Sequence, residues 1–222
     1  LPPDTVHAFR VVDAQSGKVL SKPGRFRTAP VKPRRFSFVW TADMEESYKP
    51  FRLFDRMAVR DPEFFLHLGD TVYADVPRRG FSPSISHYRR KHRNVRHDAP
   101  LQQFLRTHAT YAIWDDHETE NDCHGGHPHM AEGLQVFREY WPSKPDGSQG
   151  LYRRFNWAGV DFFILDTRTF RSPHADQEGQ AKTMLGNVQK QWLLAALESS
   201  SSPFKFIMSS VPFQGGGTDT WG

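Results

Sequence analysis

Phe64–Asp75, FFLHLGDTVYAD, is an apolar run that ends in acidic and hydrogen-bonding residues. Tyr111–Asp122, YAIWDDHETEND, has the same form. Each run indicates a buried strand whose end presents oxygen and nitrogen donors. Carboxylates, an imidazole and a phenol gathered at strand ends suit hard or borderline metal ions. We therefore expect a metal site, and the reaction class it favours is the hydrolysis of phosphate esters.

A third apolar run, Phe36–Trp40, precedes Asp43. Aspartates thus follow three expected strands, and open α/β sheets bind ligands at the carboxyl ends of their strands. A lone aspartate at a strand end more often caps a turn or a helix. Because Tyr73 and His117 accompany these aspartates, the joint pattern favours metal binding over capping.

The order of the expected elements indicates an α/β (α+β) fold. Apolar residues with helical spacing recur between the strand-like runs. Expected strands are 36–40, 63–68, 110–114, 151–157, 160–166 and 204–210, and expected helices are 48–60, 101–110, 134–140 and 187–198. Strands that alternate with helices predict a layered core.

The first thirty residues have a different pattern. Short β-like pieces on either side of a turn at residues 16–18 predict a hairpin within residues 5–28. Pro30 and Pro33 then indicate a linker, because proline resists both helix and sheet. We expect residues 1–30 to hold the last strands of a preceding β domain with its linker, and residues 31–222 to form the main domain. Both ends of the chain are expected to be cut.

Length and composition narrow the possible classes of protein. The 222 residues, 37% of them hydrophobic, are enough for one large domain. No run of about 18 apolar residues occurs, so we expect no transmembrane helix. The one cysteine, Cys123, excludes an internal disulfide framework and a zinc ribbon.

Basic residues are concentrated between residues 78 and 97, in a chain of net charge +4. One interpretation is a solvated basic helix face or loop. The other is a surface that attracts phosphorylated substrates. No recognised nucleic-acid-binding motif accompanies the basic run.

The residue types near the strand ends suggest individual roles. Gly69 allows a sharp turn and a close approach of a metal, and Asp70 can bridge two cations. A Tyr73 phenolate would require an acidic metal such as ferric iron, since the phenol pKa of about 10 must fall; otherwise Tyr73 is a packed aromatic residue. His117 is either a ligand or the donor of a proton or hydrogen bond to the leaving oxygen.

A second cluster, Cys123, His124, His127 and His129, follows the second acidic run. Its spacing would suit zinc. The glycines and the proline between these residues instead favour a mobile rim of the active site or a plain surface loop.

These residues resemble the PhoD-like family, the alkaline phosphatase D type of the calcineurin-like metallophosphatases. The matching segments are Gly69–Tyr73, Trp114–Glu118, Leu165–Arg171, Leu185–Leu193 and Ser209–Phe213. The resemblance implies a four-layer core of two sheets flanked by helices, preceded by the end of a β-sandwich domain of the fibronectin type III kind. It also implies Fe³⁺ and Ca²⁺, with Mn²⁺ or Zn²⁺ as alternatives, and the cleavage of phosphate monoesters and diesters.

The resemblance also implies roles for particular residues. Asp43, Asp70 and Tyr73 correspond to ligands on the iron side, with Asp70 also bridging. The second metal region corresponds to Asp115 and Asp116. His117 would lie beside the phosphate, and Arg168 would either face the phosphate or brace the site.

The chain departs from the family pattern at two places. Better-known members have Ser-Cys-Gln at the end of the first strand, where this chain has Thr41–Met44, so Asp43 would replace a thiolate with a harder ligand. The late Gly-Asp-x-His element is expected beyond residue 222. A longer chain or a second chain would then supply it, or the fragment would be a non-catalytic module that binds phosphate ligands or a partner.

The resemblance extends to substrates and location. It implies small phosphate esters as substrates, with nucleic acid or phospholipid as alternative diesters. It also implies a periplasmic or secreted protein, although the sequence shows no signal peptide.

Overall fold

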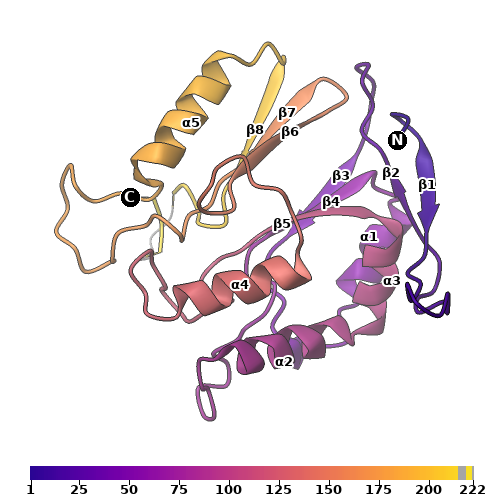
Figure 1. The fold of residues 1–222 in the computed structure, drawn as a ribbon. Coiled ribbons are helices and arrows are strands. Elements are labelled where there is room, and N and C mark those ends of the chain that lie inside the picture. The colour runs from indigo at the N-terminus through magenta and orange to yellow at the C-terminus, as the bar shows by residue number, and fades with distance from the viewer. Residues whose placement is uncertain (215–218, 222) are drawn as a thin grey trace.

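Two three-stranded sheets face each other in the computed structural model, which describes residues 1–214 and 219–221 (Figure 1). The first sheet is parallel, in the order β3-β4-β5: β3 Phe38–Thr41, β4 Phe64–Leu68 and β5 Ala109–Ile113. The second has the order β6-β7-β8: β6 Arg153–Trp157, β7 Val160–Ile164 and β8 Phe204–Met208. In it β6 is antiparallel to β7, and β8 is parallel to β7.

Helices cover the outer sides of the two sheets (Figure 1). Beside the first sheet lie α1 Leu53–Val59, α2 Ile85–Arg96, α3 Ala99–Thr107 and α4 Met130–Tyr140. Beside the second lies α5 Gly186–Glu198. The expected four-layer α/β core is thereby confirmed. No helix among the described residues combines the length and apolar character needed to span a bilayer.

Aromatic residues fill the space between the sheets. Phe38 and Phe64 stack with ring centroids 5.2 Å apart, and Phe162 packs edge-on against Phe64 at 5.3 Å. Alternate residues of a strand point to opposite faces. Phe65 therefore faces the helices instead, where it contacts Phe54 and Phe104. This alternation buries β4 on both faces and makes it the central strand.

The segment expected to be one helix over residues 48–60 is shorter in the structure. A short 3₁₀ helix, Glu46–Tyr48, precedes Pro50, and α1 begins only at Leu53. Proline lacks a backbone N–H and clashes with a preceding helical turn, so it separates the two pieces. The expected helix was wrong at its start for this reason.

Most of the basic region forms α2, so of the helix face or loop that the sequence left open, the structure has a helix. Ser84 begins the helix, and its hydroxyl accepts a hydrogen bond from the backbone N–H of His87. Much of the positive charge is paired: Lys91 contacts Glu46 at 2.5 Å, and Arg89 contacts Glu139 at 2.6 Å. Attraction of phosphorylated substrates by this helix stays a prediction.

The predicted N-terminal hairpin is confirmed. Its strands β1 Val6–Phe9 and β2 Gly24–Arg27 pair antiparallel. Arg34 ties the hairpin to the main body because its guanidinium contacts Asp4 at 2.7 Å and Glu63 at 2.5 Å. Assignment of residues 1–30 to a preceding β-sandwich domain stays a prediction.

We predict that His67 makes the fold sensitive to acid. This fully buried side chain in β4 packs against Phe65 and Trp141, and burial together with the charge of Arg96 lowers its pKa to about 3. The unfolded chain binds the proton below its pKa of about 6.5, so stability falls as pH drops from there towards 3. His67→Phe should reduce the loss of unfolding free energy between pH 8 and pH 5 by about 2 kcal/mol.

Urea unfolding at the two pH values measures this difference. His174→Phe, at an exposed position, is the control and should keep the pH dependence of the unsubstituted chain. An equal fall in both variants would mean that His67 is not the responsible group.

Candidate active site

The carboxyl ends of β3, β4 and β5 bring the predicted aspartates to one edge of the first sheet. Asp43 follows β3, Asp70 follows β4, and Asp115 and Asp116 follow β5. Backbone hydrogen bonds join the first two strand ends, with Met44 N–H donating to the Asp70 carbonyl at 2.8 Å. The sheet register therefore fixes the spacing of these loops.

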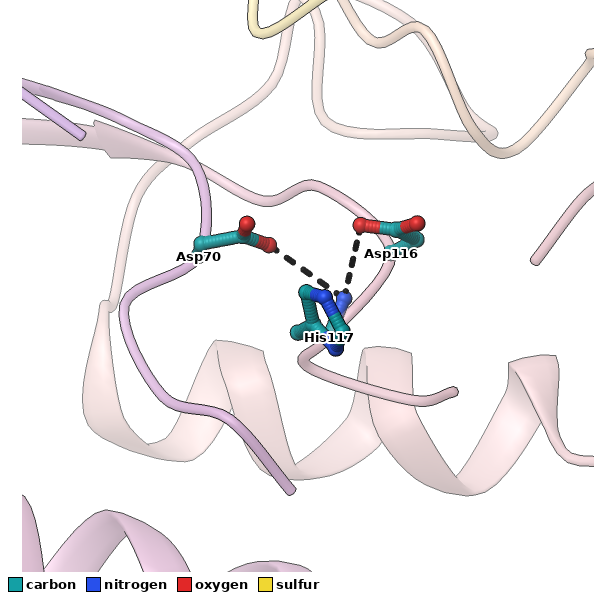
Figure 2. Close-up of side chains that lie close together, drawn as sticks. All are labelled: Asp70, Asp116 and His117. Carbon is teal, nitrogen blue, oxygen red and sulfur yellow. Dashed lines mark hydrogen bonds between the residues drawn. The ribbon is translucent and has the colours of Figure 1, made fainter. Parts of the chain in front are cut away.

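One close group of potential ligands at this edge is Asp70, Asp116 and His117 (Figure 2). Their ligand atoms all lie within 4.8 Å of one another. The backbone N–H of His117 donates to Asp116 at 3.0 Å and to Asp70 at 3.3 Å. Burial, followed by the charges of nearby carboxylates, raises the pKa of Asp70 to about 10. Such an excess of acidic groups fits a site that holds a cation.

Tyr73 and Asp43 form a second pair at the same edge. The Tyr73 hydroxyl donates to the exposed Asp43 carboxylate at 2.5 Å, and the Tyr73 ring stacks on His117 with centroids 4.1 Å apart. Burial and the bond to Asp43 raise the pKa of Tyr73. Tyr73 is thus a neutral phenol in this arrangement, and a cation would be needed to bind it as phenolate.

Asp75 orients His117, a role that the sequence analysis missed. The Asp75 carboxylate lies 2.6 Å from Nδ1 of His117 and also accepts the Asn121 N–H at 3.1 Å. Burial lowers the pKa of His117, but the bond to Asp75 and the charge of Asp116 outweigh it, so the pKa is raised. The only sequence signal was an acidic residue two positions after Tyr73.

Glu118 joins the loops that follow β4 and β5. Its fully buried carboxylate accepts hydrogen bonds from Thr71 N–H at 2.5 Å, Thr71 Oγ1 at 2.7 Å and Asp115 N–H at 2.8 Å. Burial raises the pKa of Glu118 to about 7 despite these donors. This residue was also missed, since its partner Thr71 lies 47 residues away in the sequence.

Gly69 allows the same two loops to approach closely. It has φ +101°, and a Cβ there would lie 2.6 Å from the Asp115 Cβ and 3.0 Å from the Ser210 Cβ. The sequence suggested two reasons for glycine, a sharp turn and access for a metal, and the positive φ agrees with the turn. The close approach observed is contact with the protein itself, because any side chain would push the β5 loop away.

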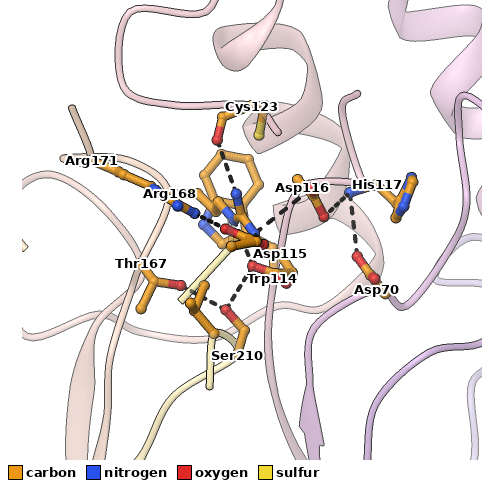
Figure 3. A network of polar contacts seen from close by, with 12 residues as sticks. Asp70, Trp114, Asp115, Asp116, His117, Cys123, Thr167, Arg168, Arg171 and Ser210 are labelled. Atoms are coloured by element: carbon orange, nitrogen blue, oxygen red, sulfur yellow. Dashed lines mark hydrogen bonds and ion pairs between the residues drawn. The ribbon is translucent and has the colours of Figure 1, made fainter. Parts of the chain in front are cut away.

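Arg168 lies behind the acidic loop rather than in the Asp70 group (Figure 3). The side chain is fully buried, and its guanidinium contacts Asp115 at 2.6 Å and Asp219 at 2.5 Å. The Asp115 carboxylate also accepts from Ser210 Oγ at 2.8 Å. Asp115 therefore faces Arg168 and Ser210, away from the group formed by Asp70 and Asp116, and the geometry favours bracing as the role of Arg168.

The histidine-rich loop does not form a zinc site among the described residues. His127 lies between His124 and His129, with ring centroids 6.2 and 5.9 Å away. No set of three close ligand atoms in residues 1–214 and 219–221 includes these histidines or Cys123; the other set found is Asp116, Asp122 and Asp219. The loop interpretation is therefore favoured over zinc.

Comparisons with known proteins agree with this architecture. The profile of the family described as PhoD-like phosphatase matches residues 38–220. Alkaline phosphatase D of Bacillus subtilis (strain 168) is 26% identical over 258 residues, which cover 96% of this chain and 43% of that protein. The chain thus spans less than half the length of this curated relative.

Two solved structures share the fold. The structure of PhoD has a TM-score of 0.82 and 23% identity, over 100% of this chain and 52% of that one. The purple acid phosphatase PPD1 from yellow lupin (Lupinus luteus) seeds has a TM-score of 0.58 and 15% identity, over 93% of this chain and 36% of that one.

We predict that Glu118→Ala will strongly destabilise the chain. The substitution leaves the buried N–H groups of Thr71 and Asp115 without their acceptor, at a cost of about 2–5 kcal/mol in unfolding free energy. Urea unfolding at pH 8 measures the loss. Glu120→Ala, which removes a carboxylate paired with the exposed Arg78, is the matched control, and a loss no larger than the control's would show that Glu118 does not hold the loops.

Proposed function

Since the chain belongs to the PhoD-like phosphatase family, we propose that it is part of a metal-dependent hydrolase that cleaves phosphate monoesters, diesters or both. The observation that carries this proposal is the close group of Asp70, Asp116 and His117 at the carboxyl edge of the first sheet. Carboxylates buried together without enough counter-charge favour a bound cation.

We propose Asp43, Asp70 and Tyr73 as holders of one cation, with Asp70 and Asp116 holding the second. Oxygen donors suit hard ions such as Fe³⁺ and Ca²⁺, and the raised pKa of Asp70 supports a binding site with unneutralised negative charge. When bound, such ions would supply an activated water or hydroxide and positive charge for the phosphoryl oxygens.

His117 is proposed as the group that gives a proton to the leaving oxygen as the P–O ester bond breaks. Asp75 occupies Nδ1, so Nε2 is the ring nitrogen left for this transfer. The raised pKa of His117 keeps the acid form available near neutral pH. Tyr73 limits the tilt of the ring by stacking on it, and Arg168 holds the Asp115–Asp116 loop in place.

Small phosphate esters are the proposed substrates. Nucleic acid or phospholipid diesters, a second chain that completes the site, and a periplasmic or secreted location are further proposals supported by family membership alone.

We predict that Asp70→Asn will lower both metal content and turnover. Loss of one carboxylate from the proposed bridging position should reduce hydrolysis at least 100-fold, because the cations supply both nucleophile and charge stabilisation. Elemental analysis for iron and calcium, with hydrolysis of bis-p-nitrophenyl phosphate and p-nitrophenyl phosphate, measures both effects. Asp55→Asn on α1 is the exposed control.

Unchanged turnover in Asp70→Asn would place the active centre elsewhere. A purified chain with neither metal nor turnover would fit both an incomplete site and the non-catalytic alternative, and the same assays on a chain extended past Gly222 would separate the two.

We predict that Asp75→Asn will shift the pH–rate profile. An amide cannot stabilise the imidazolium as a carboxylate does, so the pKa of His117 should fall. The alkaline limb of the profile, where the acid form is lost, should then move to lower pH while the fold stays intact. Measurement of kcat at pH values from 5 to 10 tests this, with Glu120→Gln as control, and an alkaline limb in the original position would exclude the assigned pair.

A further inference from the structure

A pocket of about 460 Å³ lies beside β5, the edge strand of the first sheet, and is lined by residues of β5, β6 and the C-terminal parts of α2, α3 and α4. Its lining residues include four that carry positive charge, namely Arg96, Lys144, Arg153 and Arg154. No aspartate or glutamate of the described chain is among the lining residues. The pocket shares no residue with the candidate active site.

Arg153 is buried and forms no ion pair with any carboxylate that the structure describes, although Asp146 lies near enough for its charge to offset part of the lowering of the Arg153 pKa by burial. Arg153 is 5% exposed, and its guanidinium donates only to neutral atoms: the Ala112 carbonyl at 2.7 Å, the Leu151 carbonyl at 3.3 Å and Ser143 Oγ at 3.3 Å. Its Nε finds no hydrogen-bond acceptor among the described residues. A buried guanidinium in this state retains a large uncompensated desolvation cost.

Arg96, which is half-buried, adds a second cation to the pocket. It donates to the Tyr140 carbonyl at 2.7 Å and lies over the Trp141 ring at 4.0 Å. Neither it nor Arg153 forms an ion pair with a carboxylate in residues 1–214 and 219–221. Burial lowers the pKa of both arginines to about 10, so both remain charged at neutral pH.

Arg168 is a buried arginine of the same fold whose charge is neutralised by carboxylates. It is as buried as Arg153, yet it contacts Asp115 and Asp219, and these carboxylates raise its pKa. One neighbouring donor at the pocket also lacks a partner among the described residues, Nε1 of Trp141, and this side chain is more than nine-tenths buried. Within the described chain, the pocket therefore has no carboxylate that would pair with Arg153 as Asp115 and Asp219 pair with Arg168.

We propose that this pocket binds the phosphate or phosphonate dianion of a small organic molecule. Arginine binds such groups well because its planar fork matches their oxygens. The volume lies within the range of small-molecule pockets and exceeds the need of a bare ion. Tyr111 and Phe155, stacked with centroids 4.0 Å apart, supply an aromatic wall for the organic part.

This site is independent of the proposed hydrolysis, so its test does not depend on turnover. Phenylphosphonate is the probe, since its C–P bond is not an ester, and isothermal titration calorimetry measures its binding to the purified chain. Arg153→Met should weaken binding at the pocket at least tenfold, and Lys144→Met, at an exposed position, should weaken it about threefold by loss of one charge. Asp70→Asn, which disables the candidate active site, should remove any phosphonate bound there and keep the component that binds at the pocket.

Arg56→Met, on the exposed face of α1, controls for the loss of one positive charge elsewhere. Lys144→Met keeps the test decisive if Arg153→Met fails to fold. Binding that survives in both pocket variants, or that disappears only in Asp70→Asn, would overturn the proposal, because the phosphonate would then occupy the candidate active site alone.

Discussion

The buried carboxylate of Glu118 holds together two loops that would otherwise repel each other. Asp70 lies on one loop, Asp115 and Asp116 lie on the other, and all three are acidic and buried. Glu118 is acidic too, but its carboxylate oxygens accept hydrogen bonds from the N–H groups of Thr71 and Asp115. Backbone dipoles thus offset charge that the side chains cannot, and the acidic groups are held in position before any cation binds.

The regular, well-packed strands offset the energetic cost of the strained loops that follow them. Asp43 and Asp70 both have left-handed backbone conformations, with φ of 60° and 54°, which cost energy for residues other than glycine. They follow parallel strands whose opposite faces are filled by aromatic rings, such as Phe64 on one side and Phe65 on the other. Strain at the strand ends is therefore offset by burial along the strands.

Sequence reasoning succeeded where the information is local. Apolar runs that end in aspartate predicted Asp43, Asp70 and Asp116 at one edge of a sheet. The helix α5 and the β6–β7 hairpin were also predicted near their observed bounds. It failed where contacts span the chain: Glu118 binds Thr71, and Asp75 binds a ring 42 residues away. It also gave no clear helix for α2, because the buried face of that helix carries His87, Lys91 and His92 as well as apolar residues.

The two candidate ligand sites share one physical origin, a buried charge that the described chain does not neutralise. At the carboxyl edge of the first sheet the excess is negative, and the pKa of Asp70 rises. Between β5 and β6 the excess is positive, because Arg153 is buried and forms no ion pair among the described residues, and burial lowers its pKa. Arg168 and Asp115 show that the same fold pairs opposite charges within 2.6 Å when no ligand is required. An imbalance of buried charge thus indicates where a ligand belongs, and its sign indicates which kind.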